Sequence, residues 1–104
     1  MIRNLTPHPI NIIGPEGAIA TIAPEPIPAR LAANTVSAEP IDRVPTSKTV
    51  FGEPEGLPAA VAGTWLIVSQ IIKSALSERT DLLVPAEVVR DDTGRIIGCR
   101  SLGR

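Results

Sequence analysis

Arginine is the residue type that offers this chain the most chemistry. Four arginines stand in segment 90–104, against two aspartates: Arg90, Arg95, Arg100 and Arg104. A guanidinium holds phosphate or carboxylate through two parallel hydrogen bonds, so a few converging arginines bind a small anion without a basic overall charge. We expect Arg79, Arg90 and Arg100 to contact a phosphorylated ligand. The alternative is that these side chains form ordinary surface ion pairs with neighbouring aspartates.

Three polar residues near the N-terminus recur at every second position: Asn4, Thr6 and His8. Alternate side chains of an extended chain face the same side. We therefore expect this set to form hydrogen bonds with the polar edges of a ligand or with a partner strand. The alternative for His8, which lies between two prolines, is a loop side chain that caps a backbone group.

Two further positions complete the expected ligand site. Phe51 borders a Gly-Glu-Pro-Glu-Gly loop and is placed to stack on a flat ring, whereas Trp65 heads an apolar run and is expected in the core. Ser69 stands where a strand is expected to give way to a helix, so free backbone N–H groups there could donate hydrogen bonds to a phosphate. The predicted ligand-binding residues are Asn4, Thr6, His8, Phe51, Ser69, Arg79, Arg90 and Arg100.

No arrangement typical of catalysis is present. Cys99, the only cysteine, lies in an apolar run, where a thiol is usually a small core side chain with a raised pKa. Asp91 and Asp92 diverge in a turn, and there is no glycine-rich phosphate loop or HExxH motif. We predict a protein that is not an enzyme and uses neither cofactor nor metal. A nucleotide hydrolase based on His8 or Glu53 is the weaker option.

Composition limits the size, partners and location of the protein. The 104 residues give room for one domain, 1–104. Ten basic against 11 acidic residues give a net charge of −1, which argues against binding DNA or RNA through its phosphates. No apolar run approaches the roughly 20 residues of a membrane helix, and no signal peptide is recognisable. We expect a cytoplasmic protein that binds neither a nucleic acid polymer nor a membrane.

The first half of the chain predicts short strands separated by turns. A hairpin is expected, with strands near 9–13 and 18–23 around a Gly-Pro-Glu-Gly turn. Prolines at 24, 26 and 28 favour an extended edge connection, because proline cannot donate to a sheet ladder. Strands are then expected over 30–37 and, more clearly, over 46–51.

The second half predicts a strand, a short helix and another strand. The apolar run 64–68 indicates a buried strand, Ser69 is a suitable helix N-cap, and 81–84 is a second buried strand. Pro85–Val89 suits one helical turn with proline at its first position, and a final strand closes the chain over 96–100. The fold class is α+β: a mixed sheet of about six short strands with one or two short helices.

Several segments together resemble a group of short proteins encoded by bacteriophages, prophages and actinomycete genomes. The segments that carry this resemblance are Asn4–His8, Phe51–Glu53 with Gly56–Pro58, Ile67–Ser69, Arg79–Pro85 and Ile97–Arg100. The resemblance implies a phage-derived protein acting in the bacterial cytoplasm. It is similar in size and origin to the small phage proteins that sequester nucleotide immune signals, the anti-Thoeris and anti-CBASS sponges. No binding residue is carried over from those sponges.

Two classes of function follow. The first is a non-enzymatic protein that sequesters a phosphorylated or cyclic nucleotide signal, at a site between the subunits of a homo-oligomer, since so small a domain rarely encloses a nucleotide alone. The second is a protein–protein interaction module, either a phage accessory or structural subunit or an inhibitor of a host protein. The proline-rich stretch 24–28 and the edge strands it implies favour the second class.

Overall fold

Six strands form one mixed sheet, and two more form a separate ribbon. The computed structural model describes all residues 1–104. Across the sheet the order is β1 (Ile2–Asn4), β6 (Trp65–Ile67), β7 (Leu82–Arg90), β8 (Ile96–Gly103), β2 (Ile10–Gly14) and β3 (Gly17–Ile22). The ribbon consists of β4 (Arg30–Ile41) and β5 (Val44–Glu55), which pair only with each other. The predicted mixed sheet of about six strands with one or two short helices is confirmed, with a single helix, α1 (Gln70–Ala75), in a domain that is mostly β.

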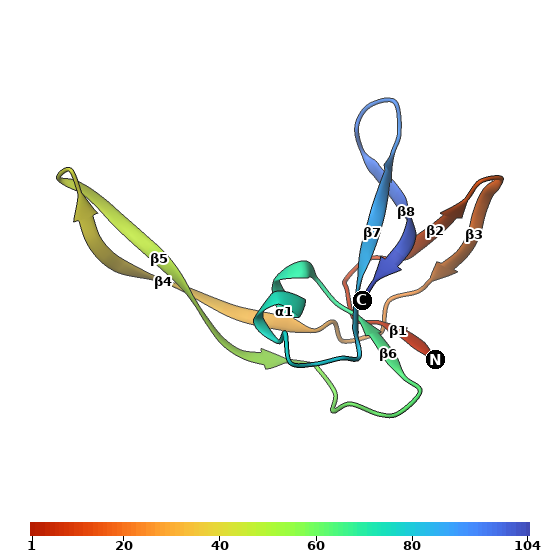
Figure 1. Cartoon of the computed structure of the whole chain (residues 1–104), viewed down its shortest axis with the longest axis horizontal. Coiled ribbons are helices and arrows are strands. Elements are labelled where there is room, and N and C mark those ends of the chain that lie inside the picture. Colours follow the sequence, from red (N-terminus) through yellow and green to blue (C-terminus); the bar gives the residue numbers. More distant parts are fainter.

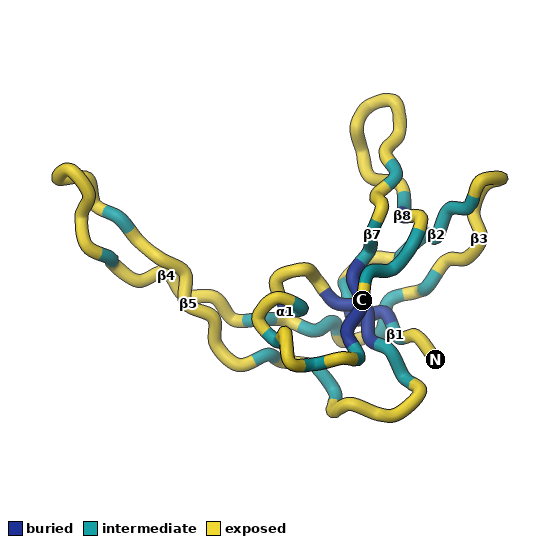
Figure 2. The backbone as a smooth tube through the Cα atoms, viewed as in Figure 1, coloured by how far each residue is buried: buried dark blue, intermediate teal, exposed yellow.

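The core lies where β1, β6 and β7 run parallel to one another. Leu66 of β6 pairs with Leu82 of β7, and β1 lies on the other side of β6 with Ile2 opposite Trp65. The apolar cluster is built from these strands, α1 and the residues beside them: Leu5, Leu66, Val68, Ile72, Leu82 and Val84. Only 10 of the 104 residues are buried. Figure 2 shows that they gather at this junction.

Helix α1 has fewer than two turns, because its N-cap, Ser69, and its C-cap, Leu76, are only seven residues apart. The Ser69 hydroxyl accepts a hydrogen bond from the Ile72 backbone N–H at 3.4 Å, as an N-cap does. Ile72 is buried in the core while its neighbour Ile71 is 56% exposed, so the helix buries a single side chain. The predicted strand–helix–strand unit is confirmed, and its two strands, β6 and β7, pair in parallel.

Three hairpins leave the core in different directions (Figure 1). They are β2–β3, β7–β8 and the ribbon, whose turn is made by Asp42 and Arg43, both with positive φ as a tight hairpin turn requires. The molecule consequently measures 55 × 39 × 23 Å. Its radius of gyration is 16.8 Å, against about 13 Å for a compact chain of this length.

Pro85–Val89 is strand and not the helical turn that the sequence indicates. These residues belong to β7 and pair antiparallel with β8, Pro85 opposite Leu102 and Val88 opposite Cys99. Beyond Leu83 strand β7 has a neighbour on one side only, so a proline there leaves no ladder bond missing on the open side. The long-range pairing with β8 therefore overrides the local preference of proline for the first turn of a helix.

Candidate ligand-binding site

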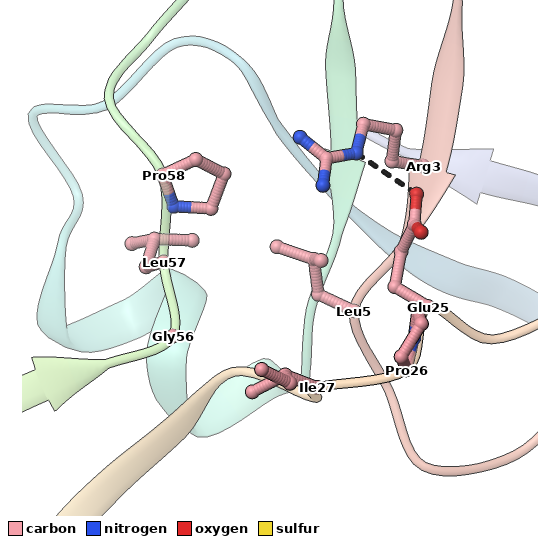
Figure 3. A pocket seen from close by; sticks show the side chains of 8 residues that line it. All are labelled: Arg3, Leu5, Glu25, Pro26, Ile27, Gly56, Leu57 and Pro58. Carbon is pink, nitrogen blue, oxygen red and sulfur yellow. Dashed lines mark hydrogen bonds and ion pairs between the residues drawn. The ribbon is translucent and has the colours of Figure 1, made fainter.

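An open pocket of about 460 Å³ lies where the ribbon joins the sheet (Figure 3). Its lining comes from β1, from the chain just before β4 and from the chain just after β5: Arg3, Leu5, Glu25, Pro26, Ile27, Gly56, Leu57 and Pro58. One charged pair therefore stands beside several apolar side chains. That combination suits a ligand with an anionic group and a flat or apolar portion.

Arg3 and Glu25 form the charged part of this pocket. The Arg3 Nε atom donates a hydrogen bond to Glu25 Oε1 at 2.8 Å, and both side chains are about one-third exposed. This bond uses the inner nitrogen only. In Figure 3 the two terminal nitrogens of the guanidinium face across the pocket, toward Pro58 and Leu5. Glu25 thus orients Arg3 and leaves its two-nitrogen edge open to a phosphate or carboxylate.

Gly56 shapes the opposite wall. Its φ is +75°, and a Cβ at this position would lie 2.8 Å from the carbonyl oxygen of Pro28. Only glycine combines that backbone conformation with so close an approach. Leu57 and Pro58 follow directly, so the turn at Gly56 places the apolar wall against the start of the ribbon.

Arg79 supports the same wall from behind. Its guanidinium donates to both carboxylate oxygens of Asp81, at 2.8 and 2.7 Å, and to the Pro58 carbonyl at 3.1 Å. The hydrogen bond from Arg79 holds the pKa of the Asp81 carboxyl below its usual range, and the same bond raises the pKa of Arg79. Arg79 is therefore engaged within the chain, as the surface-pair alternative for the arginines describes.

Asn4 organises the backbone around the pocket. Its side chain donates to the carbonyls of His8 and Ile22, at 2.8 and 3.0 Å, and accepts from the N–H and the hydroxyl of Thr6. The backbone carbonyl of Asn4 accepts a hydrogen bond from the Glu25 N–H at 2.8 Å, and this bond brings Glu25 next to Arg3. Asn4 is only 1% exposed, so each of its polar atoms is satisfied inside the protein.

The expected extended course from Asn4 to His8 is wrong. Strand β1 ends at Asn4, and Thr6–His8 form a bend that the Asn4 side chain closes. Thr6 consequently points its hydroxyl at Asn4 and at the His8 carbonyl, 2.6 and 3.0 Å away. An asparagine that hydrogen-bonds two residues ahead is a common turn former, and it prevails here over the extended preference of residues before proline.

The other predicted ligand residues lie in separate places. His8 lines a second pocket of about 410 Å³ between β2 and the β7–β8 hairpin. Phe51 lines a third hollow against α1, while Ser69 caps that helix. Arg90 donates to the Gly94 carbonyl at 2.8 Å near the tip of β7–β8, and Arg100 is exposed on β8. The structure does not bring Arg79, Arg90 and Arg100 together within one chain.

Cys99 lies in β8 and is 1% exposed. Burial raises the pKa of its thiol, as the sequence indicates for a cysteine in an apolar strand. Trp65 is half-buried, and the Arg104 guanidinium lies 4.6 Å from the centre of its ring. Neither side chain belongs to the Arg3 pocket.

Arg3 and Glu25 are the site residues that sequence reasoning does not find. They are 22 positions apart and meet only because Asn4 bridges to Pro24 in parallel register, which no local pattern reveals. Asn4, Gly56 and Arg79 shape the pocket around them.

No group of three or more His, Cys, Asp or Glu side chains is arranged to hold a metal ion. No helix is both long and apolar enough to cross a membrane. Comparison with protein families, with curated proteins and with solved structures finds no match.

Proposed function

We propose that this chain is a non-enzymatic protein that sequesters a small phosphorylated ligand, of the linear or cyclic nucleotide class. The observation that carries the proposal is the Arg3 pocket. It presents the open edge of a guanidinium beside an apolar wall of Leu5, Ile27 and Leu57. A phosphate binds such an edge through two hydrogen bonds, and the face of a base packs on aliphatic side chains.

The pocket is open on one side, as expected for a site completed by a second subunit. Ile27 stands at its margin with 72% of its surface exposed. A second copy placed over this margin would enclose the ligand and bury Ile27. The expected likeness in size and origin to the small phage proteins that sequester nucleotide signals supports a role in removing a signal from a host cell, where binding without turnover is sufficient.

Binding is tested by a thermal-shift screen against linear and cyclic nucleotides, with calorimetry on each ligand that stabilises the protein. We expect Arg3→Gln to weaken binding about 10–100-fold, because it removes a charge-assisted pair of hydrogen bonds. We expect Glu25→Gln to strengthen binding severalfold, since it keeps an oxygen for Arg3 Nε and removes a nearby negative charge.

Arg100→Gln is the matched control, because it removes an exposed arginine on β8 that is not part of the pocket. Equal loss of binding in Arg3→Gln and Arg100→Gln would contradict the assignment. The bound ligand is then released by denaturing the protein and weighed by mass spectrometry. Intact ligand supports sequestration, whereas altered ligand means that the protein is an enzyme.

One observation favours a second candidate, a protein–protein interaction module. The ribbon exposes backbone and side chains on both faces and both edges beyond its first residues. Unpaired strand edges of this kind pair readily with another chain. A complex of fixed stoichiometry with one identified host protein, together with no response to any nucleotide, would favour this candidate over sequestration.

A further inference from the structure

The ribbon, residues 30–55, is the part of the molecule least supported by its own chain. Its 12-residue strands span about 40 Å, and it contacts the rest of the molecule only near its base, where Leu31 packs against the core and Phe51 lies beside α1. At its tip, Ile41 is 66% and Val44 59% exposed. A two-stranded hairpin alone is at best marginally stable in water. The ribbon is therefore the part of the molecule that a contact with another chain would stabilise most.

The surface area indicates how much is to be covered. The chain exposes 7383 Å². A compact monomer of this mass exposes roughly 5,600 Å², so the excess is roughly 1,800 Å². A stable interface of standard size buries about 800 Å² on each partner. The excess is thus enough for each copy to give one such interface and to receive another.

The same chain carries a surface suited to receive the tip. The pocket of about 410 Å³ between β2 and β7–β8 is bordered by Val88, Ile96 and Ile97, which are 47%, 61% and 44% exposed. Apolar side chains of the tip would fill it. The net charge of −1 leaves copies of the chain with little mutual repulsion.

Charges of both signs stand at each of these surfaces. Asp42 and Arg43 form the turn of the ribbon, and Asp92 and Arg95 belong to the β7–β8 turn beside Ile96. An acidic and a basic side chain on each side allow opposite charges to pair when the tip is docked. The tip and the receiving surface therefore both combine exposed apolar side chains with charges of both signs.

We propose that the ribbon tip of one copy, at Ile41 and Val44, docks into the β2/β7–β8 groove of a second copy of this chain. The assembly closes when each copy both gives and receives a ribbon, either reciprocally in a dimer or around a ring. This inference is independent of which ligand the Arg3 pocket binds, and its tests use the protein without nucleotide.

The first test is the oligomeric state by native mass spectrometry and by light scattering over a range of protein concentrations. The wild-type protein is expected to be oligomeric at about 100 µM. The double variant Ile41→Asp/Val44→Asp is expected to weaken association more than about tenfold, because two apolar side chains lose their burial. A wild-type protein that is monomeric, or a double variant whose assembly has the same mass as the wild-type assembly, would overturn the proposal.

Ile19→Asp is the matched control for this test. Ile19 lies in β3, the edge strand of the sheet, and is 70% exposed, close to the value for Ile41. The Ile19→Asp variant is expected to form an assembly of the same mass as the wild type. If Ile19→Asp lost assembly equally, a negative charge on any exposed hairpin residue would be enough to disrupt association. That result would also overturn the proposal. Circular dichroism establishes that the variants are folded.

The second test is disulfide cross-linking between two differently tagged chains, one carrying Val44→Cys and the other Ile97→Cys. Native Cys99 is buried, so the introduced thiols are the accessible ones. A cross-link between the two chains is expected, and none is expected when Ile19→Cys replaces Val44→Cys. Assembly that depends on the tip but gives no such cross-link would overturn the choice of groove.

Discussion

Strand β6 and a segment of strand β5 are similar in composition and opposite in environment. Trp65–Ile67 and the segment Thr49–Phe51 are both short runs of aromatic and β-branched or aliphatic side chains, and both are strands. Ile67 is fully buried, whereas Val50 and Phe51 are 45% and 46% exposed. Strand β6 has a strand on each side, while β5 pairs with β4 alone. In this molecule local preference therefore forms the strand, and the number of neighbouring elements decides whether it is buried.

The largest effect that separates the two regions is expected from truncating an isoleucine in each. Ile67→Ala should cost about 2–5 kcal/mol of unfolding free energy, because it leaves a cavity among packed strands. Ile41→Ala should cost less than about 0.5 kcal/mol in dilute solution, where the tip is exposed. Urea denaturation measures both values.

Protein concentration sharpens this first comparison. If the tip docks on a second copy, the cost of Ile41→Ala grows as concentration rises, since association stabilises only the wild type fully. The cost of Ile67→Ala stays constant. A cost for Ile41→Ala that matches that of Ile67→Ala in dilute solution would mean that the ribbon is buried within its own chain.

A smaller effect is expected from the two asparagines Asn4 and Asn34. Asn4→Ala should cost about 2–3 kcal/mol, because it leaves the part-buried carbonyls of His8 and Ile22 and the Thr6 N–H without the partners that the side chain supplies. Asn34→Ala, in the exposed part of β4, is the matched control and should change stability by less than about 0.5 kcal/mol. Thermal unfolding followed by circular dichroism compares them. If the two substitutions lowered the unfolding free energy equally, the core would not be better organised than the ribbon.

The next effect depends on pH and concerns Asp81. Since the folded protein lowers the pKa of this carboxyl, its pair with Arg79 stabilises the fold above the unfolded pKa of about 3.9. That stabilisation is lost as pH falls through the lower folded value. Asp81→Asn should cost about 1–2 kcal/mol at neutral pH, and the difference from wild type should shrink below about pH 4.

Glu53→Gln is the control for Asp81→Asn, because it removes one negative charge from the exposed part of β5. It should leave the unfolding free energy at neutral pH unchanged within about 0.5 kcal/mol. Denaturant titrations at a series of pH values provide both curves. A constant difference between Asp81→Asn and wild type across the acid range would show that the ion pair contributes nothing to the fold.

The smallest effect is expected at the edge of the core, where Arg104 lies over Trp65. Arg104→Ala should cost about 0.5–1 kcal/mol, the usual size of a cation–π contact near the surface. Trp65 is the only tryptophan, so its fluorescence should shift toward that of a more solvated indole. Lys48→Ala, in the ribbon, removes a cation without changing the spectrum. An unchanged spectrum in Arg104→Ala would place that side chain away from the ring.

The elements with local signals are those that the sequence predicts. The β2–β3 hairpin follows from β-branched runs around a Gly/Pro turn, and α1 follows from Ser69 and an apolar spacing of three to four residues. The separate strand β1 is not predicted, because three residues become a strand only by pairing with β6, about 60 positions away. The helical turn expected at Pro85 fails for the same reason, since its pairing with β8 is non-local.

The candidate site is harder to predict than the fold. A side chain such as Arg79 looks like a ligand contact in the sequence because arginine chemistry is independent of context. Its two bonds to Asp81 and one to Pro58 depend on the folded geometry. Arg3 gives no sign in the sequence, because its open edge is created by a distant Glu25. Residue type therefore predicts which chemistry is available, and only the three-dimensional arrangement shows which side chains are free to use it.

The position of β1 has a consequence for how the protein is made. Leu5 and strand β1 complete the core by pairing with Trp65–Ile67, which in turn pairs with the start of β7. Strand β1 must therefore wait for its partners until synthesis has passed Leu83. Contacts of such long sequence separation slow folding. In the meantime only the local contacts of the β2–β3 hairpin and the ribbon can form. A two-stranded hairpin alone is at best marginally stable, so the arms of this protein are held in place only after its centre has assembled.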